Sequence, residues 1–194
     1  MNHLLIFIKN PIKGEAKTRL AATVGDDEAL RIYLELLKHT RSIGEKIDAH
    51  RNLFYAHFIN NSDEWNNDDF DKQLQIDGDL GEKMAAGFQA TFEKGATKAV
   101  IVGSDCASLT VDIVNDAFAK LETNDFVIGP ADDGGYYLIG MTEFIPEVFQ
   151  NITWSTEHVF PQTIEAINNQ NKSCALLPML SDIDYEEDWV KYGW

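Results

Sequence analysis

The segment Lys98-Ala99-Val100-Ile101-Val102 runs directly into Gly103-Ser104-Asp105. A short apolar run rich in β-branched residues predicts a strand that is buried on both faces, as in parallel sheets. The glycine, serine and aspartate end this strand and place a carboxylate at its carboxyl end. Ligands of open parallel sheets bind in the crevice beyond that end. This segment therefore indicates both the fold class and the place where a ligand would bind.

Strand and helix patterns alternate along the rest of the chain. Helices are expected after Asp26 or Asp27, which would cap the first, and after Thr110. Two more are expected from Gly78 to about Phe92 and over Thr156–Asn168. The segments Lys9–Gly25 and Asn60–Asp71 are expected to be loops, the second of them solvated. The other predicted strands are His3–Ile8, Asn52–Ile59, Gln73–Ile76, Phe126–Ile128, Tyr136–Gly140 and Cys174–Leu177.

This alternation predicts an α/β fold, a Rossmann-like three-layer α/β/α sandwich with a mostly parallel sheet. In the first helix the period of 3.6 residues places Leu30, Tyr33, Leu34 and Leu37 on the inner face. The chain has 194 residues, of which 44% are hydrophobic. That size suits a single domain over residues 1–194 with a substantial core.

Composition also limits location and partners. The chain has no run of eighteen apolar residues, so no membrane span is expected. Leu4–Ile8 is too short for a signal peptide. Cys106 and Cys174 lack metal-site spacing, and we expect both to be reduced in a cytoplasmic protein. The net charge of −16 repels nucleic acids and anionic membranes and argues against both as partners. Oligomeric state is not indicated.

A basic loop follows the first predicted strand. It holds four of the sixteen basic residues of the chain within Lys9–Arg19. Lysine, arginine and free backbone amides beside a glycine are suited to a diphosphate. The alternative is a solvated basic loop. We expect anion binding, because an acidic protein must supply positive charge to a phosphate ligand from such a loop, from a metal ion, or from both. The candidate residues are Lys9, Pro11, Gly14, Lys17 and Arg19.

Carboxylates follow two later strands. Asp105, beside Ser104, would hold Mg²⁺ or Mn²⁺, hard cations that bind carboxylate and phosphate oxygens; the alternative is a cap or turn. Asp132 and Asp133 stand before Gly134-Gly135 after another strand. They would orient a hydroxyl, act as a base or join the metal shell, and glycine allows close approach of the backbone. A hairpin turn is the alternative here, and a turn can also present a ligand.

Three further signals are weaker. Asp79 and Gly81 lie in Gln75–Met84, which would either contact a nucleoside or form only a capped turn. His158 is a candidate metal ligand or base, although a lone histidine is more often structural. Asp182 and Asp184 alternate in an acidic segment that is either a solvated face or the completion of the metal site.

Six segments in this order resemble one known family: FIKNPIKGEAKTRL, DGDLGEKM, GSDCASLT, GPADDGGYYLIG, WSTEHVF and SDIDYEEDW. They look like the bacterial family called domain of unknown function 2064, from Leu5 to Trp189. That resemblance implies the fold of GT-A, or nucleotide-diphospho-sugar, transferases, and some members are linked to arsenosugar biosynthesis. The family commonly has proline where this chain has Ala107, which would loosen the turn but keep the carboxylate.

The chain is more distantly similar to nucleotidyltransferases that attach guanylyl groups to molybdopterin or phospholactate. This similarity implies phosphate contacts for Lys17 and Arg19 and metal binding for Asp105. The leading hypothesis is therefore a metal-dependent glycosyltransferase that uses a nucleoside-diphosphate sugar and an unidentified small acceptor. The alternatives are a nucleotidyltransferase that releases pyrophosphate, a non-catalytic sugar- or nucleotide-binding module, and a protein-interaction domain.

Overall fold

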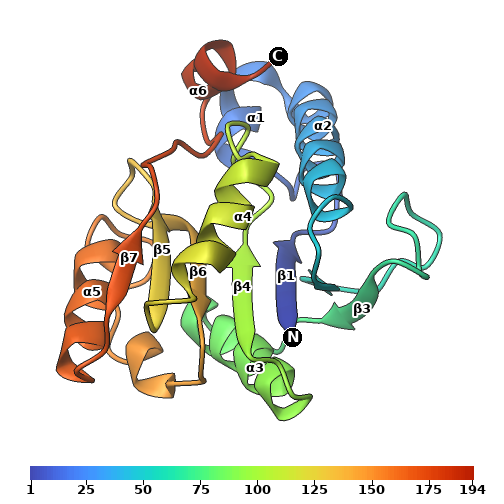
Figure 1. Ribbon diagram of the computed structural model, residues 1–194. Coiled ribbons are helices and arrows are strands. Elements are labelled where there is room, and N and C mark those ends of the chain that lie inside the picture. The colour runs from blue at the N-terminus through green and yellow to red at the C-terminus, as the bar shows by residue number, and fades with distance from the viewer.

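A single seven-stranded sheet organises the chain in the computed structural model, which describes residues 1–194. The strand order is β3-β2-β1-β4-β6-β5-β7 (Figure 1). All neighbouring strands pair in parallel except those next to β6, which is antiparallel to β4 and β5. The strands are β1 (Asn2–Ile8), β2 (His50–Tyr55), β3 (Asp71–Leu74), β4 (Lys98–Val102), β5 (Phe126–Pro130), β6 (Tyr136–Met141) and β7 (Cys174–Leu176).

Helices cover both faces of this sheet. A cluster of 24 buried residues joins α2 and α4 to one face, and a cluster of 13 joins α3, η1 and α5 to the other. The α/β/α sandwich with a mostly parallel sheet is thus confirmed. None of the helices is long and apolar enough to cross a membrane. The helices are α1 (Thr18–Val24), α2 (Asp26–Gly44), α3 (Leu80–Glu93), α4 (Val111–Lys120), η1 (Pro146–Phe149), α5 (Val159–Asn169) and α6 (Glu186–Tyr192).

A third, smaller cluster lies beyond the carboxyl ends of the parallel strands. It joins α1, α2 and α6 around Leu20, Ile32 and Ile183, and α1 and α6 lie together above the tips of β1 and β4 in Figure 1. Ala107 is buried in this cluster. The small side chain of Ala107 therefore packs with residues from α1, α2 and the segment around Ile183.

Several expectations were wrong. Helix α1 interrupts the predicted Lys9–Gly25 loop, and α6 stands in the acidic segment. Helix α2 has Gly25 as its N-cap residue, at φ 84°, and no side chain caps it. Its buried face includes Ile32 and Leu36, whereas Leu34 is 48% exposed. The strand predicted over Asn52–Ile59 is β2, and it ends earlier, at Tyr55, because the chain there turns into the loop before β3.

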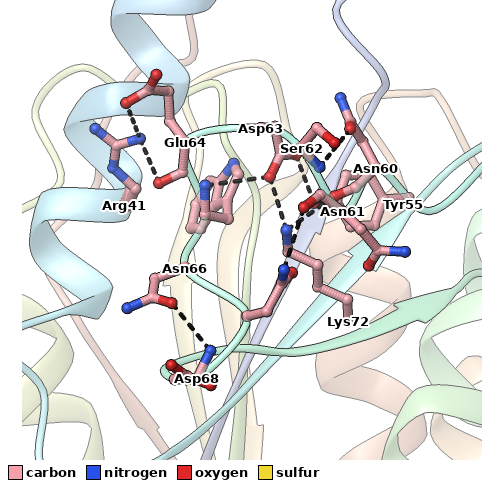
Figure 2. A network of polar contacts seen from close by, with 12 residues as sticks. Arg41, Tyr55, Asn60, Asn61, Ser62, Asp63, Glu64, Asn66, Asp68 and Lys72 are labelled. Carbon is pink, nitrogen blue, oxygen red and sulfur yellow. Dashed lines mark hydrogen bonds and ion pairs between the residues drawn. The ribbon is translucent and has the colours of Figure 1, made fainter.

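That loop, between β2 and β3, is only partly solvated. Trp65 and Phe70 are buried and pack edge to face. Figure 2 shows a polar network in the same loop, in which Asp63 accepts hydrogen bonds from Tyr55 Oη at 2.6 Å and Lys72 Nζ at 2.8 Å. The Lys72 side chain is 5% exposed and that of Asp63 is 21% exposed. This nearly buried ion pair therefore fastens the loop to the sheet.

Replacing Asp63 with asparagine should lower the free energy of unfolding by about 2–4 kcal/mol, because it leaves the Lys72 ammonium buried without a counter-charge. Urea unfolding would measure the loss. Asp68→Asn is the matched control: Asp68 is exposed in the same loop, and it should change stability by less than about 0.5 kcal/mol. Equal effects of the two substitutions would contradict the anchoring role of Asp63.

A buried histidine lies at the start of β1. His3 is 2% exposed, its ring lies 4.9 Å from that of His50, and its Nε2 has no hydrogen-bond partner. Burial, followed by the charges of His50, the N-terminus and Lys94, lowers the pKa of His3 from 6.5 to about 4. As pH falls, the unfolded chain therefore binds this proton first, and the folded protein loses stability between about pH 6.5 and pH 4.

Removing this titration should flatten the acid dependence of stability. His3→Leu should lose less free energy of unfolding than the wild type between pH 7 and pH 4.5, by about 2 kcal/mol. Urea unfolding across that range would measure the difference. His57→Asn is the control, because His57 is exposed. If the free energy of unfolding of His3→Leu depends on pH as steeply as that of the wild type, His3 does not cause this dependence.

Candidate functional site

A cleft of about 620 Å³ opens at the edge of the sheet where the parallel strands end. The segments that follow β1 and β4 contribute to it, and the chain leaves these neighbouring strands in opposite directions, β2 lying on one side and β6 on the other. This is the switch point at which α/β sheets bind ligands. The cleft is lined by Lys9, Lys17, Thr18, Arg19, Tyr33, Leu80, Asp105, Asp133, Gly135, Tyr136, Trp154, Ser155, Thr156, Glu157, Val159, Asp182 and Asp184.

Tyr33 of α2 joins the two segments at the switch point. Its hydroxyl accepts a hydrogen bond from the Lys9 amide at 2.9 Å and lies 3.2 Å from Ser104 Oγ. Burial, and then the charge of Asp105, raises the pKa of Tyr33, so the hydroxyl stays neutral. Ser104 is itself buried and does not line the cleft. Its hydroxyl therefore supports the floor of the site from below.

Lys17 ties the basic loop to the far end of the chain. Its Nζ lies 3.0 Å from Asp105 Oδ1 and 3.8 Å from Asp184 Oδ1, and it donates to the Ile183 carbonyl at 2.7 Å. The Lys17 side chain is 6% exposed. Its backbone is left-handed at φ 53°, a conformation that costs a non-glycine residue energy and is held only by its surroundings. The buried contacts of the Lys17 side chain hold its backbone in this conformation.

The segment around Ile183 brings two carboxylates to the cleft. Ile183 is fully buried, and its amide donates to the Asp105 carbonyl at 2.9 Å. Ile183 packs into the core, while its two neighbours Asp182 and Asp184 line the cleft. Arg19 donates to Asp184 Oδ2 at 2.9 Å. The alternation expected from the sequence thus has a structural cause.

Carboxylates crowd this part of the cleft. Burial, followed by the negative charge of Asp105, raises the pKa of Asp182 to about 7, and the Lys17 ammonium offsets only part of this rise. Such an excess of acceptor oxygens suits a hard divalent cation. Yet no three histidine, cysteine, aspartate or glutamate side chains are already grouped around a common ion position. The donor chemistry fits Mg²⁺ or Mn²⁺, while the Lys17 ammonium lies between the candidate ligands Asp105 and Asp184.

The opposite wall comes from residues 153–159, before α5. Trp154 lies against the start of α3, where a Cβ on Gly81 would come within 2.4 Å of the indole ring. Gly134, at φ 88°, packs equally closely on the backbone of Glu157, and its carbonyl accepts from the Phe160 amide at 2.8 Å. The two glycines do not line the cleft; they leave the room that this wall needs.

The paired aspartates differ in position. Asp133 lines the cleft and also accepts a hydrogen bond from the Gly135 amide at 2.8 Å. Asp132 is held by Ser181, whose hydroxyl donates to it, and does not line the cleft. Asp133 thus both takes part in the expected turn and presents a carboxylate to the cleft.

The structure brings together about half of the residues that the sequence pointed to. His158 is exposed at the start of α5, outside the cleft. Asp79 caps α3 by accepting from the Glu82 amide at 2.8 Å. The sequence reasoning missed the cleft roles of Tyr33, Tyr136 and Trp154. The candidates that line the cleft are Lys9, Lys17, Arg19, Asp105, Asp133, Gly135, Asp182 and Asp184, and those outside it are Pro11, Gly14, Asp79, Gly81, Ser104, Asp132, Gly134 and His158.

Comparison with known proteins confirms the family resemblance. Residues 39–156 match the model of a family described as "uncharacterized protein conserved in bacteria (DUF2064)". The chain belongs to this family. No curated protein matches it. A crystal structure from Desulfovibrio desulfuricans, provisionally described as a nucleotide-diphospho-sugar transferase, is 30% identical, with 95% of this chain and 82% of that chain covered and a TM-score of 0.88.

More distant structures share the fold. The inositol-1-phosphate CTP transferase from T. maritima is 13% identical, covers 97% of this chain and 91% of its own, and has a TM-score of 0.62. A Mycobacterium tuberculosis protein solved in complex with manganese is 10% identical, with coverage of 98% and 97% and a TM-score of 0.58. The Rossmann-like fold of the nucleotide-diphospho-sugar transferases is therefore the fold of this DUF2064 protein.

The contact between Gly81 and Trp154 gives a test of the wall. Gly81→Ala should displace the indole, with a net loss of about 1 kcal/mol in stability, because overpacking outweighs the better helix propensity of alanine. The fluorescence of Trp154, taken as the difference between each protein and its Trp154→Phe counterpart, should become more accessible to acrylamide. Ala86→Gly, in the same helix, is the control for helix propensity. Unchanged quenching would mean that Gly81 does not position Trp154.

Proposed function

We propose that this DUF2064 protein is a divalent-metal-dependent glycosyltransferase that uses a nucleoside-diphosphate sugar. The observation that carries the proposal is the composition of the cleft at the switch point. Three basic residues, Lys9, Lys17 and Arg19, come from the loop after β1 and the first turn of α1. They share the cleft with the carboxylates of Asp105, Asp182 and Asp184. The basic side chains would bind a diphosphate, and the carboxylates would bind a cation that accompanies it.

The similar structure from Desulfovibrio desulfuricans favours a nucleotide-sugar donor, since it is provisionally described as a nucleotide-diphospho-sugar transferase. The manganese in the more distant mycobacterial structure is in keeping with metal use on this fold. In this chain Asp105, Asp182 and Asp184 would hold the metal, which would neutralise charge on the leaving diphosphate. Lys9, Lys17 and Arg19 would bind the phosphate oxygens that remain.

The chain's own residues would also serve the acceptor. An acceptor hydroxyl oxygen forms the new bond to the anomeric carbon of the sugar, while the bond from that carbon to the diphosphate oxygen breaks. Its electron pair leaves with the nucleoside diphosphate. Asp133, the aspartate of the pair that faces the cleft, would accept the hydroxyl proton. Asp132 would instead keep Ser181 and the metal-side segment in place.

Nucleotide binding should stabilise the protein only when the metal is present. A ligand at a hundred times its Kd adds about 2.7 kcal/mol, which raises the Tm of a chain of this size by about 5–11 °C. Thermal unfolding with nucleoside diphosphates, triphosphates and diphosphate sugars, with and without Mn²⁺ or Mg²⁺, would measure it. Asp105→Asn should remove the shift while the protein still folds. Asp112→Asn, an exposed residue on α4, should leave the shift unchanged.

The products then separate two kinds of transfer. Release of a nucleoside diphosphate from a diphosphate sugar supports the glycosyltransferase. Release of pyrophosphate from a triphosphate would replace it with a nucleotidyltransferase. A shift with no product of either kind would indicate a binding module, and the absence of any shift would contradict the proposal as a whole.

A further inference from the structure

The cleft has two sides of different chemistry. Every basic residue that lines it comes from the loop after β1 or from the first turn of α1, which follows that loop. The strand order places β4 and then β6 beside β1, so the start of β6 lies two strands, or roughly 10 Å, away from that loop. On this far side the lining has no lysine, arginine or histidine. It consists of Asp133, Gly135, Tyr136, Trp154, Ser155, Thr156, Glu157 and Val159.

We define the aromatic–acidic wall as Asp133, Trp154 and Glu157. Two of its side chains, and the backbone of the third residue, are held in place before any ligand arrives. The Asp133 carboxylate accepts from the Gly135 amide, the Trp154 indole rests on Gly81, and the Glu157 backbone is packed on Gly134. The loop that carries Trp154 is further held by hydrogen bonds: the Thr153 amide donates to Gln162 at 2.7 Å, and Thr156 Oγ1 donates to the Thr153 carbonyl at 2.6 Å. The wall is therefore preorganised, which limits the entropy that binding would cost.

The charges of the cleft oppose an anion at this wall. Five carboxylates line the cleft against three basic side chains. Two of those three, Lys17 and Arg19, are already paired with Asp105 and Asp184. Nothing cationic is left on the far side to pair with a phosphate group, and a phosphate there would face Asp133 and Glu157. Hydroxyl groups, in contrast, can donate to both carboxylates while a sugar ring packs on the indole face.

We propose that the aromatic–acidic wall binds the acceptor, and that the acceptor is an uncharged polyhydroxyl compound rather than a phosphate ester. This inference rests on the proposed transferase function, since it assigns the second substrate of the same cleft. It also explains why the basic residues are confined to one segment: the donor brings the only phosphates that this cleft receives.

The charge of the wall can be measured without any donor. The fluorescence of Trp154 is isolated as the difference between the wild type and Trp154→Phe and is then quenched by iodide, caesium and acrylamide. We expect caesium to quench Trp154 at least about threefold better than iodide, relative to free tryptophan. The paired variant Asp133→Asn/Glu157→Gln should bring the two ions close to equality.

The matched control carries the same change in net charge elsewhere. Asp68→Asn/Asp69→Asn alters two exposed residues of the loop before β3 and should leave the preference for caesium unchanged. If iodide and caesium quench wild-type Trp154 equally, or if the control pair acts like the wall pair, the assignment of an anion-excluding wall is overturned. This result stands whether or not the protein proves to be a transferase.

The acceptor itself is tested with matched pairs, at saturating donor and metal. Glycerol is compared with glycerol 3-phosphate, and glucose with glucose 6-phosphate, by the rate at which nucleoside diphosphate is released. The neutral member should be at least about tenfold faster, and Glu157→Lys, which leaves Asp133 in place, should reduce that ratio. A faster phosphate ester would overturn the acceptor assignment and leave the transferase intact. If the protein binds the donor but releases no nucleoside diphosphate with any of these compounds, that result would also contradict the acceptor assignment.

Discussion

The site depends on one buried ammonium group. Lys17 contacts Asp105 after β4 and the Ile183 carbonyl near the end of the chain, so a single side chain joins three segments that are far apart in sequence. A lysine that is 6% exposed is tolerated only when its charge is paired and hydrogen-bonded. The left-handed backbone of Lys17 adds to that cost. The contacts that offset it are the same contacts that assemble the cleft.

These contacts explain why the third core cluster exists. Ile183 is fully buried in it beside Leu20, one residue from the Arg19 that pairs with Asp184. The apolar side of the segment packs α1 and α6 together, and its polar side supplies carboxylates. Burial of one residue therefore sets the direction of its two neighbours. A site built in this way is as rigid as the packing behind it.

The sequence predicted the parts of the fold that have strong local signals. The apolar runs of β1 and β4 and the Thr110 cap of α4, which accepts from the Ile113 amide at 3.3 Å, match the expectation closely. Helix α1 was missed because it is short and has no side-chain cap. The buried face of α2 differs from the predicted one, and Leu34 is exposed. The reason is that α2 also packs in a cluster with α1 and α6, and a periodic pattern within one helix cannot reveal such contacts.

The same distinction holds for the site. Residues that directly follow a strand, such as Asp105, could be placed because all parallel strands end at one edge. The choice of Asp133 over Asp132 depended on a hydrogen bond from Ser181, which is distant in sequence. The role of Trp154 depended on the space above Gly81. Its segment belonged to the family resemblance, but only the packing shows that it forms a wall of the cleft.

The balance of charge gives the proposed donor chemistry its physical reason. A phosphate that enters the cleft must compete with Asp105 and Asp184 for Lys17 and Arg19, since only Lys9 is exposed and outside these pairs. Removing either cation from its carboxylate would leave an unpaired charge beside Asp182, whose pKa is already raised to about 7. Additional positive charge must therefore accompany the phosphate. In a protein with a net charge of −16, the divalent cation that we propose at Asp105, Asp182 and Asp184 would supply that charge.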